Sequence, residues 1–500
     1  MSHWIIVPVV LPALVAALMV LVLRGRLTLQ RIASLATLVA LNAVAIALLS
    51  SATLHGPEAY FLGDWPAPFG IVLVLDRLSA LMVTLLSGLA LLTTLYAIGS
   101  NWDAKGTHFH PLTMFLLMGV AGAFLTGDAF NLFVFFEVLL IASYGLMIHG
   151  GGEARTRAGI QYIAFNLVGS ALFLFALALL YATTGTLNFA DLAQKLPALP
   201  PEDAALLRVA AVMLLLVFAI KGALVPLQFW LPGTYANAPG VVAALFAIMT
   251  KVGAYATIRL ATLVFPLDLS ATGTLIPAIL LPTALATLAI GSLGVLGATT
   301  LPRLAAFAAI ASMGTAFLAI AHMTPRGTSA ALYYILHSTL ATALIFLVAD
   351  LVERRRAHLA LRSAAPVSQS GLMAALFLAV AVALAGMPPL SGFIGKLMVL
   401  DVWRDDALVI WPAVLISSFL MLLGLARAGS GLFWKPAEAA ASPAPPPDEP
   451  LALLATFALL AAVVALTLAA GPITDWLTTT AEALHAPEAY IAANRIGGGT

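Results

Sequence analysis

Five titratable side chains stand inside long apolar stretches of this sequence, where ionisable residues are rare. They are Glu137 in NLFVFFEVLLIASYGLM, Lys221 in VFAIKGALVP, Lys251 in FAIMTKVGAY, His337 in YYILHSTLATALIFL and Lys396 in GFIGKLMVL. An ion inside an apolar span is costly, so a surviving ionisable residue there is a functional candidate. Carboxylate, amine and imidazole groups all bind and release protons, and the chemistry that they suggest is proton transfer.

Each of these residues also has a structural interpretation. Glu137 and Lys221 could form a buried ion pair that pins two helices together, although desolvation offsets most of the Coulomb gain of such pairs. His337 could equally be a satisfied core histidine. Arg259 lies eight residues after Lys251, near the expected end of its span. We therefore expect Arg259 to snorkel to the membrane surface in a structural role.

Prolines interrupt the helices that carry two of the lysines. Pro226 removes the hydrogen bond to the carbonyl of Gly222 and so unwinds the helix just after Lys221. Backbone freed at that depth must be satisfied by protein or water, which predicts a polar, wet pocket beside Lys221.

Pro388 and Pro389 interrupt a second helix just before Lys396. Two interrupted, charge-bearing helices in corresponding halves of a chain are typical of the internal repeats of transporters.

The composition places these residues in a membrane. The chain has 500 residues, of which 62% are hydrophobic and 9% charged, and its mean hydropathy is +1.05. Such values indicate a polytopic membrane protein. The formal net charge is +1 and there is no cysteine, so a nucleic-acid partner, disulfides and thiolate metal sites are not expected. No motif for a metal or another cofactor is present.

About fourteen segments are long and apolar enough to cross a bilayer. They start near residues 4, 31, 77, 112, 129, 159, 208, 240, 274, 302, 329, 370, 409 and 451. Assigning the loops alternately puts most Lys and Arg residues, among them Arg24, Arg26 and Arg354, on one side. The positive-inside rule makes that side cytoplasmic and places both termini outside the cytoplasm.

Two segments near the C-terminus differ from the spans. Residues 435–450, KPAEAAASPAPPPDEP, are rich in Pro and Ala and predict an extended cytoplasmic linker. The last span is followed by DWLTTTAEALHAPEAYIAANRI, which we interpret as an interfacial or disordered tail within residues 451–500.

Three stretches together carry a family resemblance. LFVFFEVLLIASYGLM, KGALVPLQFWLPGTYANAPGVVAALFAIMTKVGAY and GMPPLSGFIGKL resemble the antiporter-like membrane subunits shared by respiratory complex I and Mrp-type cation/proton antiporters. Within that superfamily, LHSTLATALIFLVADL and ARAGSGLFWKP are most similar to the D-type subunits of Mrp (Pha) antiporters.

The resemblance implies an all-α membrane fold of about fourteen helices with two inverted five-helix repeats, each containing a broken helix. Helices 1–3 would occupy residues 1–111, the first repeat (helices 4–8) residues 112–265, and the second repeat (helices 9–13) residues 266–434.

By motif position, the resemblance implies that Glu137 matches the family's fifth-helix glutamate and Lys221 its seventh-helix lysine. Lys251 would match the eighth-helix lysine and Lys396 the twelfth-helix lysine. One departure concerns His337, which many relatives follow with a lysine four residues later, whereas this chain has Ala341. Water beside His337 would then replace the relay lysine between Lys251 and Lys396.

The resemblance implies a proton-translocating subunit of a multi-subunit Na⁺ or K⁺/proton antiporter, a transporter and not an enzyme, in the bacterial cytoplasmic membrane. Its partners would be the other membrane subunits of that complex. The alternative is a proton-pumping membrane subunit of complex I or of a membrane-bound hydrogenase. Local chemistry would be the same in both, and only the partner subunits would distinguish them.

Overall fold

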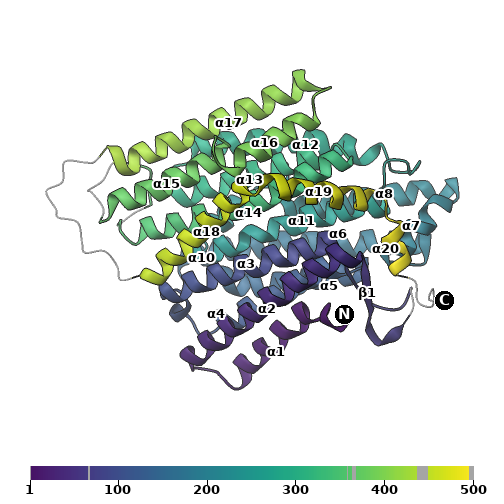
Figure 1. The fold of residues 1–500 in the computed structure, drawn as a ribbon, viewed down its shortest axis with the longest axis horizontal. Coiled ribbons are helices and arrows are strands. Elements are labelled where there is room, and N and C mark those ends of the chain that lie inside the picture. Colours follow the sequence, from purple (N-terminus) through teal and green to yellow (C-terminus); the bar gives the residue numbers. More distant parts are fainter. Residues whose placement is uncertain (1, 66–67, 357–358, 363–367, 436–448, 495–500) are drawn as a thin grey trace.

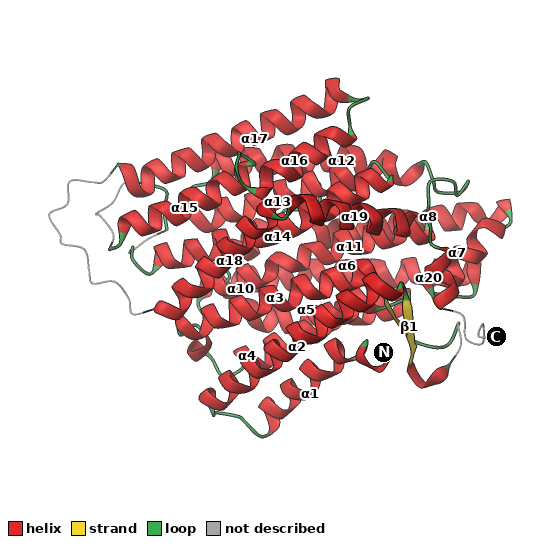
Figure 2. Cartoon of the chain, in the orientation of Figure 1, coloured by secondary structure: helices red, strands yellow, loops and turns green. Residues whose placement is uncertain are grey.

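The computed structural model describes residues 2–65, 68–356, 359–362, 368–435 and 449–494. Within them the chain is almost entirely helical (Figure 2). The first half contains α1 (Val7–Leu21), α2 (Leu27–His55), α3 (Arg77–Gly99), α4 (Phe109–Leu125), α5 (Ala129–Met147), α6 (Glu153–Thr184), α7 (Phe189–Lys195), α8 (Ala204–Gly222), α9 (Trp230–Asn237), α10 (Gly240–Leu245) and α11 (Met249–Arg259). The second half contains α12 (Leu275–Gly297), α13 (Leu301–Ile320), α14 (Pro325–Glu353), α15 (Ser370–Ala385), α16 (Ser391–Val402), α17 (Ala407–Gly429), α18 (Pro450–Leu468), α19 (Ala470–His485) and α20 (Glu488–Ala493).

Eleven of the helical segments in the described residues are long and apolar enough to cross a membrane, and α1, α4 and α15 are shorter apolar helices. The predicted starting points of the spans all fall at or near the start of one of these segments. Spans were predicted well because an unbroken apolar run of this length has few other uses. The count of fourteen crossings stays a prediction.

The helices run roughly side by side, with α1 and α2 along one edge of the molecule and α15 to α17 along the other (Figure 1). Helices α13 and α14 lie between these edges, and 89% of the apolar window of each is buried. The segment Gly240–Val264, which contains α10 and α11, is buried completely. The start of α1 and α20 lie at the same end of the stack, and the end of α17 and the start of α18 lie at the opposite end (Figure 1). The predicted linker at 435–450 lies almost entirely outside the described residues.

A short β-hairpin interrupts the helical pattern between α2 and α3. Strand β1 (Glu58–Phe61) pairs antiparallel with β2 (Val72–Leu75), with Glu58 opposite Leu75 and Phe61 opposite Val72. The sequence analysis expected helices alone and did not include this hairpin, because strands of this length are too short to leave a clear alternating pattern.

The C-terminal segment is folded onto the protein. Helix α19 packs against α14 and buries Leu477, Ala481 and Leu484. Trp476 donates a hydrogen bond to the Thr53 hydroxyl at 3.1 Å. The prediction of an interfacial or disordered tail was therefore wrong for these residues, since their apolar face has a protein partner that the sequence did not reveal.

Two features recur in the two halves. The helix that carries Lys221 is broken into α8 and α9, and the helix that carries Lys396 is broken into α15 and α16. The next long helix of each half ends in a π-helical turn, at Leu260–Val264 after α11 and at Ser430–Trp434 after α17.

Candidate functional site

Glu137 and Lys221 face the same helix, α6, which packs against both α5 and α8. The ammonium of Lys221 donates to Oδ1 of Asn166 at 2.9 Å and lies 5.6 Å from the ring centroid of Phe136. The hydroxyl of Ser170, one turn further along α6, donates to the carboxylate of Glu137. Lys221 is only 6% exposed.

The break after Lys221 is confirmed. Helix α8 ends at Gly222 and α9 begins at Trp230, with Pro226 between them. The main-chain N–H of Val225 donates to the Thr287 hydroxyl at 2.9 Å, and the indole N–H of Trp230 donates to the carbonyl of Ile220 at 3.0 Å. Side chains thus satisfy backbone groups on both sides of the gap. The wet pocket beside Lys221 stays a prediction.

The second break also separates two helices around proline, but its lysine lies on the other side of the gap. Helix α15 ends at Ala385 and α16 begins at Ser391, and Pro388 and Pro389 lie between them. Lys396 lies after this break, whereas Lys221 lies before its own.

The side chain of Lys396 reaches back across the gap. Its ammonium donates to the carbonyl of Ala385 and to the Ser418 hydroxyl, both at 2.8 Å. Carbonyl groups at a helix C-terminus carry partial negative charge, which favours a cation there. Gly386 leaves the necessary room, since a Cβ at that position would lie 2.5 Å from Cδ of Lys396.

Lys251 lies on α11 and His337 on α14, two helices that are in contact. His337 is 1% exposed, and its Nδ1 lies 2.9 Å from the hydroxyl of Ser391, the first residue of α16. The charges of Lys251 and Lys396 both act on this imidazole. His337 therefore links α11 to the second helix break.

Lys251 has the least ordinary surroundings of the three lysines. Its side chain is fully buried, and within the described chain its ammonium has no hydrogen-bond partner. The hydroxyls of Thr250 and Thr342, on the same two helices, also lack partners there. Buried polar atoms are nearly always paired with protein or water, so we expect internal water beside these groups.

The two clusters adjoin through a close approach of α8 and α11. A Cβ on Gly253 would lie 2.7 Å from the main-chain nitrogen of Gly222, so the two backbones are almost in contact two residues from Lys251. All five predicted residues are thus brought together in two neighbouring groups, Glu137 with Lys221 and Lys251 with His337 and Lys396.

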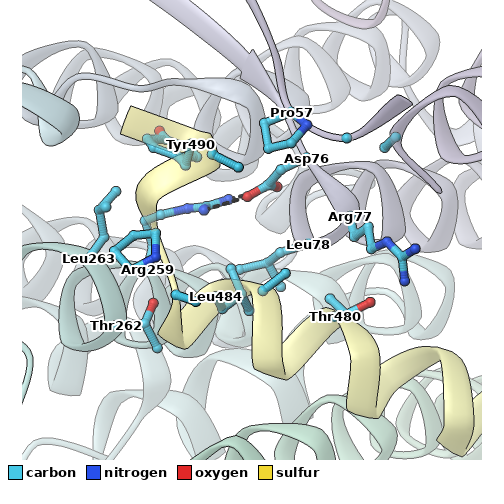
Figure 3. Close-up of a pocket in the computed structure, with 16 residues that line it drawn as sticks. Pro57, Asp76, Arg77, Leu78, Arg259, Thr262, Leu263, Thr480, Leu484 and Tyr490 are labelled. Carbon is cyan, nitrogen blue, oxygen red and sulfur yellow. Dashed lines mark hydrogen bonds and ion pairs between the residues drawn. The ribbon is translucent and has the colours of Figure 1, made fainter. Parts of the chain in front are cut away.

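Arg259 departs from its prediction. It does not snorkel: the side chain is 3% exposed, and its guanidinium donates two hydrogen bonds to Asp76, at 2.6 and 2.9 Å. Figure 3 shows this pair beside a cavity that α19 and α20 help to line, with Tyr490 of α20 near the guanidinium. The cavity has a volume of about 110 Å³. Arg259 belongs to a buried ion pair between α11 and the start of α3.

Sequence reasoning also missed several polar partners of the site. Asn166 and Ser170 stand four residues apart in the apolar run of α6, the only signal that the sequence offers for them. Ser391 and Ser418 give no signal at all, because single serines are common in apolar helices. The partners of a buried charge come from helices distant in the chain, and their identity depends on packing.

Comparisons with known proteins identify relatives of this chain. The family described as "NADH:quinone oxidoreductase/Mrp antiporter, TM" matches residues 126–423. The D-type subunit of a probable K⁺/H⁺ antiporter of Rhizobium meliloti (strain 1021) is 38% identical over 99% of both chains. The D-type subunit of a Na⁺/H⁺ antiporter of Bacillus subtilis (strain 168) is 36% identical, also over 99% of both.

Among solved structures, a chain of the Mrp complex from Dietzia sp. DQ12-45-1b superposes with a TM-score of 0.88 and is 29% identical, over 99% of this chain and 100% of that one. The match therefore extends over both broken helices and the C-terminal segment. The chain belongs to the NADH:quinone oxidoreductase/Mrp antiporter transmembrane family.

Proposed function

We propose that this chain is the D-type subunit of a multi-subunit monovalent cation/proton antiporter, and that it carries protons through Glu137, Lys221, Lys251, His337 and Lys396. Relatives named as D-type subunits of Na⁺/H⁺ and K⁺/H⁺ antiporters match it from end to end, which favours an antiporter over a redox-driven pump. It is a transporter component and not an enzyme, and other membrane subunits are its partners.

One observation carries the proposal. Within the described residues, Lys221, Lys251 and Lys396 are buried without a carboxylate in ion-pair contact. Lys221 donates to an amide and Lys396 to a carbonyl and a hydroxyl, whereas Lys251 has no hydrogen-bond partner there. The buried cation Arg259, by contrast, has Asp76. A lysine that served only as half of a structural ion pair would need such a carboxylate. A buried lysine without one is easily neutralised, which suits a group that binds and releases protons.

The proton path would run from Glu137 and Lys221 through Lys251 and His337 to Lys396. Water near Thr250 and Thr342 would stand where many relatives have a relay lysine. The repeated breaks and π-turns support two repeats, at residues 112–265 and 266–434, flanked by helices 1–3 and by residues 435–500. We also propose that both termini face away from the cytoplasm of the bacterial cell.

Glu137→Gln tests the proposal. The amide can still accept the hydrogen bond of Ser170, so the change removes the charge and leaves the contact. We expect cation/proton exchange driven by a pH gradient to be lost in everted vesicles, while the complex assembles at normal levels. Wild-type exchange at matched protein levels would refute the proposed role of Glu137.

A further inference from the structure

Helix α6 supplies a hydrogen-bond partner to Glu137 and another to Lys221. In the described structure Glu137 and Lys221 are not joined as an ion pair, and each is bonded to its own residue of α6. Asn166 and Ser170 lie four residues apart, on the same side of the helix. Both are nearly buried, at 1% and 8% exposure.

The amide of Asn166 is held in one orientation. Its Nδ2 donates to the carbonyl of Tyr162 at 2.8 Å, a bond that only the nitrogen can make. Oδ1 is therefore the atom that faces Lys221, and it can accept a hydrogen bond from either the charged or the neutral amine.

Ser170 has two acceptors for one hydrogen. Its oxygen lies against the carboxylate of Glu137 and also 3.0 Å from the main-chain oxygen of Asn166. A hydroxyl has one O–H to donate and lone pairs to accept. It donates to Glu137 when that carboxylate is ionised. When Glu137 is protonated, the new carboxyl O–H donates to Ser170, and the serine hydrogen turns to Asn166.

We propose that Asn166 and Ser170 are positioning residues that hold the ammonium of Lys221 and the carboxylate of Glu137 apart, with Ser170 turning its hydroxyl as Glu137 gains and loses a proton. This inference rests on the function proposed above. Asn166 gives the ammonium an acceptor other than Glu137. Without it, the buried amine would turn to the carboxylate, and a closed ion pair would favour the charged lysine and oppose release of its proton.

Two pairs of substitutions separate this role from simple packing. Ser170→Thr keeps the hydroxyl, whereas Ser170→Val has nearly the shape of threonine without it. We expect Ser170→Thr to retain most of the exchange rate and Ser170→Val to lose roughly tenfold or more, the scale of a lost hydrogen bond to a charged group. Asn166→Leu should lose a similar factor. Combining it with Ser170→Val should add little, because residues acting as a unit are non-additive.

The matched control is Thr456→Val on α18. It removes a hydroxyl that is equally buried and bonded to the carbonyl of Ala452 at 2.9 Å within its own helix. Exchange in everted vesicles containing the full complex should be unchanged. Equal rates for Ser170→Thr and Ser170→Val, or wild-type exchange in Asn166→Leu, would overturn the inference.

A second readout does not depend on transport. In the purified complex, the infrared band of the protonated carboxyl group that disappears in Glu137→Gln should shift in Ser170→Val and stay in place in Thr456→Val. An unshifted band in Ser170→Val would also overturn the inference. Glu137→Gln tests the proposed function separately from the role of α6. If Glu137→Gln abolishes exchange while Ser170→Thr and Ser170→Val exchange at equal rates, the proposed function stands and only the role of α6 is refuted.

Discussion

Arg259 and Lys251 are two cations of one helix, eight residues apart, and their buried side chains have different partners. Arg259 meets Asp76 in a geometry that satisfies two N–H groups at once. Lys251 has neither an acid nor a hydrogen-bond partner within the described chain. The first arrangement stabilises a permanent charge, and the second allows the charge to be lost. Burial alone does not make a residue functional, because its partners decide whether a proton can leave.

This contrast predicts that Arg259→Lys harms the fold more than the chemistry. A lysine cannot reproduce the forked pair of bonds to Asp76, and a weakened buried ion pair leaves poorly compensated charge. We expect the free energy of unfolding of the detergent-solubilised complex to fall by about 1 to 3 kcal/mol, the scale of a lost hydrogen bond to a charged group. Thermal unfolding measures this change. Exchange per assembled complex should change little.

Arg326→Lys is the control for that measurement. Arg326 pairs with Asp401, but its side chain is 70% exposed, and exposed ion pairs contribute little. Equal stability of the two variants would contradict the structural role assigned to Arg259.

At the scale of elements, the two helix breaks depend on small residues as well as prolines. A Cβ on Gly392 would overlap the carbonyl oxygen of Ala383 and lie 2.8 Å from Nε2 of His337. The first turn of α16 therefore packs directly on the end of α15 and on the imidazole.

We expect Gly392→Ala to push α16 away from His337 and to reduce exchange by more than about tenfold, although no titratable group is altered. The measurement is exchange in everted vesicles at matched protein levels. Gly371→Ala, near the start of α15, is the control, since nothing lies within 4 Å of a Cβ there. Full activity of Gly392→Ala would mean that this contact is not needed for transport.

Elements were predicted from sequence more reliably than contacts. Long apolar runs located the spans, and Pro226, Pro388 and Pro389 located the breaks, because both signals are local. The partner of Arg259 is 183 residues away in the chain, and the packing of α19 on α14 is equally non-local. The apolar face of α19 was visible in the sequence, but whether lipid or protein covers it was not. For the same reason Glu137 and Lys221 could be singled out in the sequence, whereas Asn166, which accepts a hydrogen bond from Lys221, could not.

The whole molecule offers a direct test of its orientation. The chain contains no cysteine, so a single introduced thiol has no background within this subunit. Thr28, at the start of α2, and Glu202, just before α8, are both exposed. Alternating loops put them on opposite sides of the membrane, with Thr28 on the side rich in Lys and Arg.

In intact cells, a membrane-impermeant thiol reagent should label Glu202→Cys and spare Thr28→Cys, with the reverse in everted vesicles. Both variants should retain exchange, because neither position touches the charged clusters. Labelling of Thr28→Cys from outside the cell would reverse the proposed topology and place the termini in the cytoplasm.

The carbonyl group of Ala385 accepts a hydrogen bond from the ammonium of Lys396. This contact affects how protons would move along the buried titratable residues from Glu137 to Lys396. A carbonyl offers an acceptor but no neutralising charge, so every proton taken up at Lys396 adds a full positive charge to a buried region. The charges of Lys251 and Lys396 both act on the imidazole of His337. If these residues carry protons, a positive charge on one of them should raise the free energy of protonating its neighbour. We therefore expect protons to move in single file, each vacating its place before the next arrives.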